Sequence, residues 1–287
     1  MNGWNLPAPD QWEQMAWNSF MEDLGNGDLS GACLDPEHIT SWYIEAQASG
    51  VVCGLGIAHW LLRPEEPRPD LGIRVLRTDG DRVERGTRVL EGRFYSAAIV
   101  AKERSALNYL MLLSGTASLT RKFVDAVEGT QAKIVDTRKT IPGMRSLQKY
   151  AVRCGGGTNH RRGLYDGVML KDNHLMALGG VSEGVRRAKR SAPHTVKIEV
   201  ECETLEQVDE AVAAGADIIM LDNMDPFSMR EAVLKHRGRC SFEASGGVSL
   251  ETVAQFAATG VDLISVGMLT HSAPSLPFHL EFERDPL

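Results

Sequence analysis

The pattern of apolar and polar residues changes about 130 residues into the chain, which predicts two parts of different architecture. From Lys133 onward, short apolar runs alternate with helical stretches. Runs that begin near Val196, Ile218, Cys240 and Leu263 lie 22 to 23 residues apart, the length of a compact strand–helix unit. The six runs are KIVDT, GVMLKDN, VKIEVE, DIIMLDN, CSFEASGG and LISVG. About six units are fewer than the eight of a complete α/β barrel, so we predict an incomplete parallel α/β barrel.

The first part of the chain has the pattern of a mixed helix and strand unit. Apolar residues at helical spacing predict a helix over residues 10–24, with Asp10 as a candidate N-cap. A second, long helix is expected over residues 105–127, where Gly115 indicates close packing or a break. Strands are predicted at residues 39–47, 51–62, 72–78 and 88–100.

The end of the chain returns to a strand pattern. In PFHLEFE, Phe278, Leu280 and Phe282 alternate with polar residues, which indicates a half-buried strand that rejoins the N-terminal sheet. We therefore predict an N-terminal α/β sandwich-like domain over residues 1–116, completed by residues 276–287, and a barrel domain over residues 117–275.

Composition narrows the class of protein. The formal net charge of −7 argues against nucleic acid or an anionic membrane surface as the main partner. No apolar run reaches the roughly 18–20 residues of a membrane span, and the N-terminal stretch lacks the features of a signal peptide. Five cysteines without a C-x-x-C pair favour reduced thiols in a cytoplasmic protein over a disulfide framework or a zinc site.

The average charge conceals a cationic segment. Residues 133–174 contain nine Lys or Arg and three Asp, a local charge of +6. In an otherwise acidic chain this indicates a focused anion site, although a chance cluster on a solvated face gives the same count.

Each predicted strand of the second part ends in groups that can do chemistry. In α/β barrels the active site lies at the carboxyl ends of the strands. Early strands end in cations and later strands in carboxylates, which favours an active site over ordinary polar loops. The strand-end residues are Asp136, Arg138, Lys139, Lys171, Asp172, Asn173, Glu199, Glu201, Asp222, Asn223, Glu243, Ser245 and Gly267.

Three stretches suggest particular ligands. Ser245, Gly246 and Gly247 lie between a strand and a helix expected to be capped by Ser249, an arrangement that favours a phosphate, as does the following SVGMLTHS loop. A tight turn would explain one Gly-Gly pair, but glycine in two consecutive loops favours the phosphate. The segment after the triple glycine contains His160 and Arg161. His160 by itself is compatible with a flexible, exposed connector, whereas the planar guanidinium of Arg161 suits a carboxylate or phosphate. Finally, Glu201 and Asp222 either bind Mg²⁺ or form ion pairs with Lys171 and Lys139.

Several long blocks resemble the quinolinate phosphoribosyltransferase family. They are DTRKTIPGMRSLQKYAVRCGGGTNHRRGLYDGVMLKDNH (136–174), EVECETLEQVDEAVAAGADIIMLDN (199–223), EASGGVS (243–249), ISVGMLTHSAP (264–274) and ERSALNYLMLLSGTAS (103–118). The resemblance implies an N-terminal sandwich-like domain, an incomplete barrel, and a homodimer in which Arg104 reaches the neighbouring subunit's site. It also implies transfer of phosphoribosyl from phosphoribosyl pyrophosphate to quinolinate with loss of CO₂, a step of NAD biosynthesis that yields nicotinate mononucleotide and pyrophosphate.

The resemblance also assigns residues to roles. It implies catalytic roles for Lys139, Lys171, Glu201 and Asp222, the last two beside the ribose and a Mg²⁺ cofactor. The substrate-binding residues that it implies are Arg104, Thr137, Arg138, His160, Arg161, Ser245, Gly246, Gly247, Gly267 and His271.

Three other functions remain open at this point. Lys171 at a strand end could form a Schiff base in a lyase. The same fold could transfer phosphoribosyl to a monocarboxylate without releasing CO₂. A non-catalytic protein could bind a phosphorylated metabolite, although binding alone does not require carboxylates that face the ribose.

Overall fold

The computed structural model describes residues 5–64 and 70–283. The chain divides into two compact units. The first unit comprises Met1–Arg121, Ser146–Gly156 and Ser272–Leu287, and the second comprises Lys122–Arg145 and Gly157–His271. Within the described residues, none of the helices combines the length and apolar character that crossing a membrane requires.

The first unit is built on an antiparallel sheet with strand order β12-β1-β5-β3. Every second residue of β1 is buried, as expected for a strand with one face on the core. In β12, Phe278 and Leu280 are buried while His279 and Glu281 are exposed. The end of the predicted C-terminal strand, residues 284–287, lies outside the described residues. The strands are β1 (Ile39–Ala46), β2 (Gly50–Val51), β3 (Gly72–Val75), β4 (Arg82–Val83), β5 (Arg88–Tyr95) and β12 (Phe278–Phe282).

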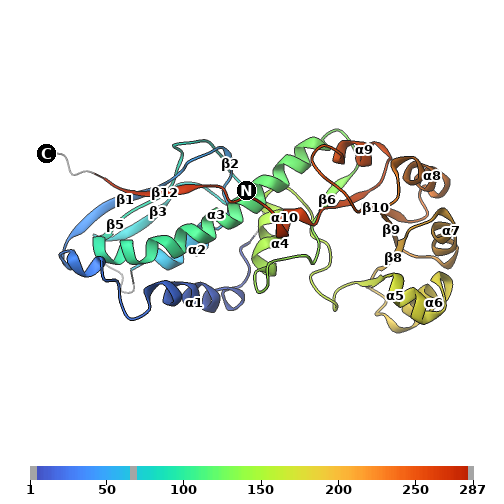
Figure 1. The fold of residues 1–287 in the computed structure, drawn as a ribbon, viewed down its shortest axis with the longest axis horizontal. Helices are drawn as coiled ribbons and strands as arrows, with labels where there is room; N and C mark the ends of the chain where they lie inside the picture. The colour runs from blue at the N-terminus through green and yellow to red at the C-terminus, as the bar shows by residue number, and fades with distance from the viewer. Residues whose placement is uncertain (1–4, 65–69, 284–287) are drawn as a thin grey trace. The chain divides into compact units, whose positions relative to one another are not determined.

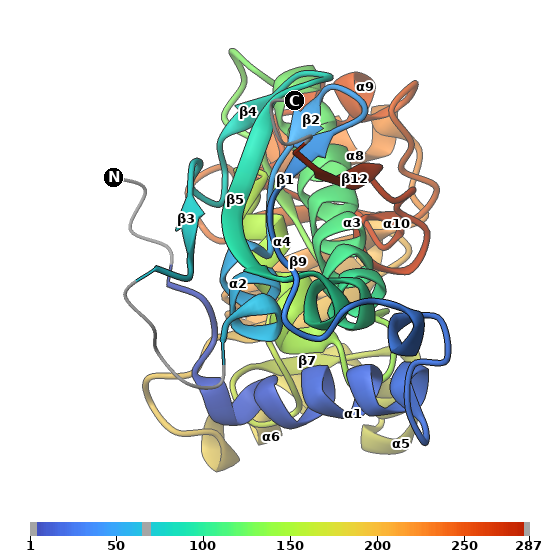
Figure 2. The same ribbon diagram turned by 90° about the vertical axis from the view of Figure 1, so that its left-hand side faces the viewer.

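Helices α2 and α3 run along one face of this sheet (Figures 1 and 2). The helix predicted over residues 105–127 is confirmed but starts earlier, directly after β5, so that Arg104 lies inside it and not before it. The N-cap position of α1 is Trp12 and not Asp10, which belongs to a preceding 3₁₀ turn. The helical elements are η1 (Pro9–Gln11), α1 (Glu13–Leu24), η2 (Gly31–Cys33), α2 (Leu55–Leu62), α3 (Ser96–Ala126) and α4 (Arg145–Cys154).

The strand predicted over residues 51–62 is wrong for most of its length. Residues 55–62 form α2, and only the short strand β2 precedes it. The half-buried Asp79 carboxylate accepts hydrogen bonds from the backbone N–H groups of Gly54 and Leu55, both at 3.0 Å. This carboxylate satisfies donors that a helix start leaves unpaired, and so stabilises the helix.

Gly115 marks close packing of α3 and not a break. A Cβ atom on Gly115 would lie 2.2 Å from the carbonyl oxygen of Pro274 and 2.9 Å from Cα of Ser275. The contact is backbone against backbone, so rotating a side chain cannot relieve it. The segment is fixed there by the Leu276 N–H, which donates to the carbonyl of Met111 at 3.1 Å.

We expect Gly115→Ala to lower the free energy of unfolding by about 1–3 kcal/mol, because overpacking outweighs the gain in helix propensity. Urea denaturation followed by circular dichroism would measure the change. Asn108→Ala, at an exposed position of the same helix, is the control and should change stability by less than about 0.5 kcal/mol. A stabilised Gly115→Ala variant would contradict the packing argument, because alanine is the better helix former.

The second unit contains the predicted parallel α/β array. Its sheet has six parallel strands in the order β6-β11-β10-β9-β8-β7. Six strands leave the barrel incomplete, which confirms the predicted fold class. The strands are β6 (Lys133–Val135), β7 (Val168–Leu170), β8 (Ile198–Cys202), β9 (Ile218–Asp222), β10 (Ser241–Ser245) and β11 (Leu263–Ser265).

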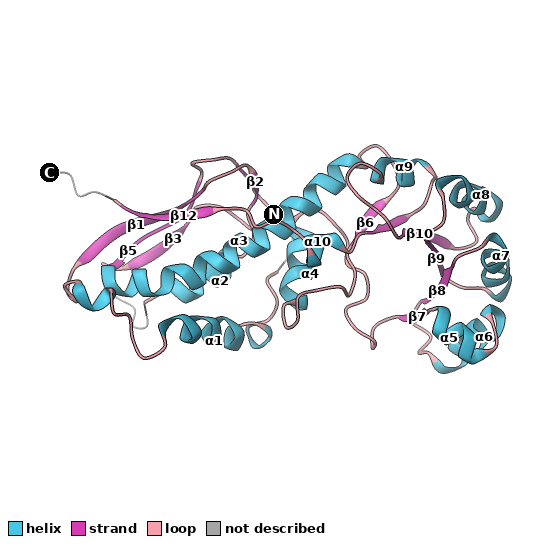
Figure 3. Cartoon of the chain, in the orientation of Figure 1, coloured by secondary structure: helices cyan, strands magenta, loops and turns pink. Residues whose placement is uncertain are grey.

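Helices cover the outer side of these strands (Figure 3). Two of these helices begin at local capping motifs: Thr204 and Gln207 form a capping box, and the Asp225 side chain caps the helix that begins at Pro226. The helices of this unit are α5 (Asp172–Leu178), α6 (Val181–Ser191), α7 (Leu205–Ala214), α8 (Pro226–His236), α9 (Val253–Ala258) and α10 (Met268–His271).

The chain that follows Gly157 lies along the open edge of β6. Val135 and Thr158 form an isolated parallel bridge, and the Thr158 N–H donates to the carbonyl of Ile134 at 2.8 Å. Residues 158–161 therefore enter the barrel beside β6, where a closed barrel would have a further strand.

Candidate active site

A cavity of about 530 Å³ lies at the carboxyl ends of the parallel strands. Its volume is in the range typical of small-molecule sites. Cations from the first two strand ends and carboxylates from the later ones line the same space. The lining residues are Thr137, Arg138, Lys139, His160, Arg161, Met169, Lys171, Glu201, Met220, Asp222, Asn223, Ser245, Gly246, Gly247 and Ser265.

Three residues implied by the family resemblance are not among those that line the cavity. Gly267 and His271 lie beside it, since a Cβ on Gly267 would be 3.2 Å from both Cδ of Lys139 and Nε2 of His271. Arg104 belongs to the first unit, where it is an exposed residue of α3.

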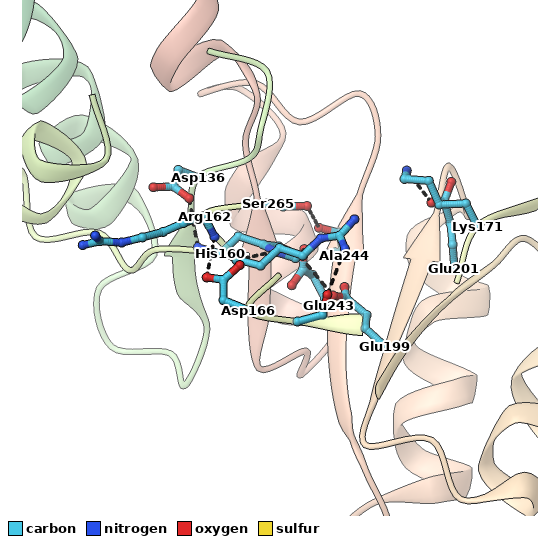
Figure 4. Close-up of polar contacts among 12 residues, drawn as sticks. Asp136, His160, Arg162, Asp166, Lys171, Glu199, Glu201, Glu243, Ala244 and Ser265 are labelled. Atoms are coloured by element: carbon cyan, nitrogen blue, oxygen red, sulfur yellow. Dashed lines mark hydrogen bonds and ion pairs between the residues drawn. The ribbon is translucent and has the colours of Figure 1, made fainter. Parts of the chain in front are cut away.

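Lys171 and Glu201 form an ion pair on one side of the cavity. Lys171 Nζ lies 2.7 Å from Glu201 Oε2, and Figure 4 shows this pair apart from the cluster around His160. The lysine side chain is 42% exposed and the glutamate 15%, so the carboxylate is the more enclosed partner. The ion pair between Lys171 and Glu201, one of the alternatives considered from the sequence, is therefore present in the structure.

The turn that carries Arg138 and Lys139 is held by hydroxyl groups. The Lys139 N–H donates to Thr137 Oγ1 at 3.0 Å, and Thr270 Oγ1 donates to the carbonyl of Lys139 at 2.7 Å. Arg145 adds a contact from its Nε to Thr140 Oγ1 at 3.2 Å. The two cations therefore extend from a turn whose backbone is fixed.

Arg161 is anchored near both of its ends. Its N–H donates to the His160 Nδ1 atom at 2.7 Å, and its Nη1 donates to the carbonyl of Gly167 at 2.9 Å. Burial in the cavity wall and the neighbouring Arg138 charge lower the pKa of Arg161 from its usual value. Arginine nevertheless stays charged, and the part of this shift due to Arg138 is repulsion between like charges, which a bound anion would relieve.

Asp136 organises the segment that carries His160. Its fully buried carboxylate accepts hydrogen bonds from the His160 N–H at 2.9 Å and from Asn159 Nδ2 at 2.6 Å. Asp136 thus ties the 158–161 segment to the end of β6.

His160 faces two buried glutamates from other strands. Its Nε2 lies 3.1 Å from Glu199 Oε2 and 3.7 Å from Glu243 Oε1 (Figure 4). Burial, reinforced by the nearby Glu199 carboxylate, raises the pKa of Glu243 to about 7. Glu243 is therefore partly protonated at neutral pH, which limits the repulsion between the two carboxyl groups.

The glycine loop after β10 contacts the end of β9. Asn223, the one non-glycine with positive φ among the described residues, donates its N–H to the Ser245 carbonyl at 2.9 Å. The expectation that Ser249 caps a helix here is wrong, because α9 begins at Val253 with Thr252 at the N-cap position. The candidate anion donors that this loop contributes to the cavity are therefore Ser245 and the backbone of Gly246 and Gly247.

The sequence reading missed several residues that shape the cavity. Met169 and Met220 line it from the inner faces of β7 and β9, and Ser265 does so from β11. The strand alternation contained this signal, because Met220 stands in register with both Glu201 and Glu243 and shares their face.

The carboxylates of Glu201 and Asp222 are oxygen donors of the type that Mg²⁺ prefers. Glu201 Oε2 is engaged by Lys171, and Asp222 Oδ2 accepts from Asn223 Nδ2 at 2.9 Å. Each carboxylate retains a second oxygen, and the usual Mg²⁺ site in enzymes of phosphorylated substrates completes its ligands with phosphate oxygens and water. The donor set therefore fits Mg²⁺ in the presence of a phosphorylated substrate.

Comparison with known proteins agrees with this architecture. Family models described as quinolinate phosphoribosyl transferase match the chain, the N-terminal domain at residues 28–114 and the C-terminal domain at residues 116–281. A Bacillus subtilis protein named probable nicotinate-nucleotide pyrophosphorylase [carboxylating] is 42% identical over 273 residues, covering 94% of this chain and 93% of the relative. The nicotinate-nucleotide pyrophosphorylase [carboxylating] of Mycobacterium leprae is 44% identical over 237 residues, covering 81% and 82% of the two chains.

A solved structure supports the same assignment. The nicotinate-nucleotide pyrophosphorylase from Francisella tularensis superimposes with a TM-score of 0.92 at 34% identity, covering 96% of this chain and 97% of that chain. Both halves of the chain thus match one family along nearly their whole length. The chain belongs to the quinolinate phosphoribosyl transferase family.

Proposed function

We propose that this protein transfers the phosphoribosyl group of phosphoribosyl pyrophosphate to quinolinate and releases pyrophosphate and CO₂. The product is nicotinate mononucleotide, which places the reaction in NAD biosynthesis. The observation that carries the proposal is a cavity in which cations face carboxylates across a glycine loop. The names of the relatives and the two family models support it.

The cationic side of the cavity would bind quinolinate. Quinolinate carries two carboxylates on neighbouring ring carbons, and each needs a charge-assisted partner once water is excluded. Arg138 and Arg161 offer planar guanidinium groups, and Lys139 and Lys171 offer point charges. This side of the site would fix the ring and hold its nitrogen toward the ribose.

The acidic side would stabilise the transferring ribose. As pyrophosphate leaves, positive charge develops at C1 of the ribose. Carboxylates of Glu201 and Asp222, held at the ends of neighbouring strands, would stabilise that charge by preorganised electrostatics. Mg²⁺ held by these two residues and by phosphate oxygens would neutralise charge on the leaving pyrophosphate.

The substrates themselves supply much of the chemistry. The pyridine nitrogen attacks with its own lone pair, so the protein needs no nucleophile of its own. Bond formation makes the ring a pyridinium, and loss of CO₂ from the adjacent carbon leaves an electron pair that this ring stabilises. Lys139 or a water molecule would then return a proton to that carbon. Positioning and electrostatics are thus the main tasks of the site.

The remaining family roles belong to the same proposal. Ser245, Gly246 and Gly247, with Gly267 and His271, would hold the 5-phosphate of phosphoribosyl pyrophosphate, and Thr137 would contact substrate. Arg104 would reach the site of the partner in a homodimer. A cytoplasmic location stays a prediction from the cysteine pattern.

The direct test is incubation of the purified protein with quinolinate, phosphoribosyl pyrophosphate and Mg²⁺. Equal amounts of CO₂ and nicotinate mononucleotide are expected. Nucleotide without CO₂ would indicate a monocarboxylate transferase, and a borohydride-trapped adduct on Lys171 would indicate a Schiff-base lyase. If none of these products forms, the proposed activity is excluded.

We expect Arg138→Ala to raise the KM for quinolinate about 10- to 150-fold, because a lost charge-assisted contact costs about 1.5–3 kcal/mol. Steady-state kinetics with each substrate varied in turn would measure this, and the KM for phosphoribosyl pyrophosphate should change far less. Arg162→Ala is the matched control, because Arg162 is exposed and does not line the cavity. An unchanged KM for quinolinate would remove Arg138 from the binding site.

A further inference from the structure

The cluster of His160, Glu199 and Glu243 has the composition of a metal site. One ligand atom from each residue lies within 4.8 Å of the others, and it is the one such group among the described residues. Both glutamates are almost completely buried. Two functions are possible for such a group: the three side chains bind a cation, or they hold one another in place.

The ring of His160 decides between the two. The Arg161 N–H points at Nδ1 from 2.7 Å, so Nδ1 is an acceptor and carries no proton. Turning the ring over would place a C–H group against that N–H. The proton of a neutral imidazole therefore lies on Nε2, which faces Glu199 at 3.1 Å. A metal bound at Nε2 requires the opposite tautomer, with a proton on Nδ1 that donates to an acceptor.

The two sides of His160 are thus connected to different parts of the molecule. Its Nε2 is in ion-pair contact with Glu199 on β8 at 3.1 Å, and Glu243 on β10 lies at 3.7 Å. Its Nδ1 accepts from the backbone of Arg161, and its own N–H is held by Asp136. Nδ1 is therefore engaged by the backbone of the next residue, and Nε2 faces the two buried glutamates.

The chain of contacts through His160 leads to Arg161, which lines the cavity. Arg161 is fixed through its N–H by His160 and through Nη1 by the carbonyl of Gly167. A free arginine side chain loses rotamer entropy when it binds an anion. Fixing the side chain beforehand reduces that loss and sets the plane of the guanidinium group.

We propose that Glu199 is a positioning residue, supported by Glu243, which fixes the Nε2–H tautomer of His160 and thereby holds Arg161 ready for a carboxylate of the substrate. This inference rests on the proposed function for the identity of that substrate. The tautomer and the hydrogen bonds do not depend on it.

The first test examines the protein without substrate. Nitrogen-15 NMR of ring-labelled histidine, with His160→Asn identifying the signal, should show Nδ1 unprotonated and Nε2 protonated at neutral pH. Added Zn²⁺ or Mn²⁺ should leave this signal unchanged. A proton on Nδ1, or a metal-dependent shift that Glu199→Gln abolishes, would overturn the proposal in favour of a metal site.

The second test uses kinetics. Glu199→Ala should raise the KM for quinolinate about tenfold, the effect of losing roughly one hydrogen bond, with little change in the KM for phosphoribosyl pyrophosphate. Glu199→Gln keeps an oxygen acceptor and should recover most of the loss. Glu203→Ala, at an exposed position just after the same strand, is the control. An equal loss in the alanine and glutamine variants would overturn the acceptor role.

A pair of substitutions at His160 provides evidence even if Glu199→Ala does not fold. The Oδ1 atom of His160→Asn can replace Nδ1 as the acceptor for the Arg161 N–H, whereas His160→Gln mainly preserves the reach of Nε2. The asparagine variant should therefore bind quinolinate more tightly than the glutamine variant. The reverse order would show that the link to Arg161 is not the one that matters. If the wild-type protein does not convert quinolinate, the proposed function fails, while the NMR result still tests the positioning network.

Discussion

Replacing Glu201 with glutamine is expected to lower kcat about 100- to 1,000-fold, the usual effect of removing one preorganised electrostatic group. The substitution preserves shape and removes the charge that would face the developing cation at C1 of the ribose. Because the carboxylate lies 2.7 Å from Lys171 Nζ, the substitution also weakens the hold on that lysine. Rapid-quench measurement of a single turnover would report the chemical step directly.

Glu203→Gln is the matched control for this result. Glu203 lies two residues further along, is exposed, and does not line the cavity. Its substitution should leave kcat within about a factor of two, as for most surface changes. A Glu201→Gln enzyme with normal kcat and a raised KM would show that Glu201 serves binding of the ground state and not the transition state.

The regular spacing of the strands is the reason that the barrel could be predicted. Each strand–helix unit of the second half has nearly constant length, and local signals mark its borders, such as the capping box at Thr204 and the Asp225–Pro226 start. These signals depend on neighbours in sequence, so they survive without knowledge of the fold.

The strand predicted at residues 51–62 was wrong because a long-range contact, and not a local signal, sets the structure there. An apolar run of this length is ambiguous between a buried strand and a buried helix. The Asp79 carboxylate that caps the helix start is 24 residues beyond Leu55 in the sequence. A long-range contact thus decides the secondary structure, and no local pattern contains that information.

In the candidate site, too, some features could be predicted from the sequence and others depend on the folded structure. Polar strand ends indicated which residues would meet, because parallel strands bring their carboxyl ends to one edge. The sequence could not indicate which atoms each side chain would face. Lys171 faces Glu201, and Asp136 accepts hydrogen bonds from Asn159 and from the backbone of His160. These choices depend on distances between strands that only the folded sheet sets.

Gly246→Ala is expected to raise the KM for phosphoribosyl pyrophosphate about 5- to 150-fold. Gly246 has a φ of +92°, and a Cβ there would lie 2.1 Å from Oδ1 of Asn223 and 3.0 Å from its backbone nitrogen. An L-residue in such a conformation costs about 1–3 kcal/mol, and the loop avoids the cost by moving away from its binding shape. Initial rates at varied phosphoribosyl pyrophosphate and saturating quinolinate would measure the change.

Substitutions at Gly247 and Gly238 distinguish the effect of the clash with Asn223 from the effect of backbone strain alone. Gly247, in the same loop, has a φ of +62° and no described atom within 4 Å of its Cβ position, so Gly247→Ala should have the smaller effect. Gly238, with a φ of +78° and an equally open Cβ position, lies in the turn after α8 and does not line the cavity. Gly238→Ala should therefore affect stability and leave the KM unchanged. If Gly246→Ala and Gly247→Ala raised the KM equally, strain would be the cause and Asn223 would have no part in holding the loop. If neither raised it, the phosphate would have to bind elsewhere, because the backbone of this loop is what the glycines leave accessible.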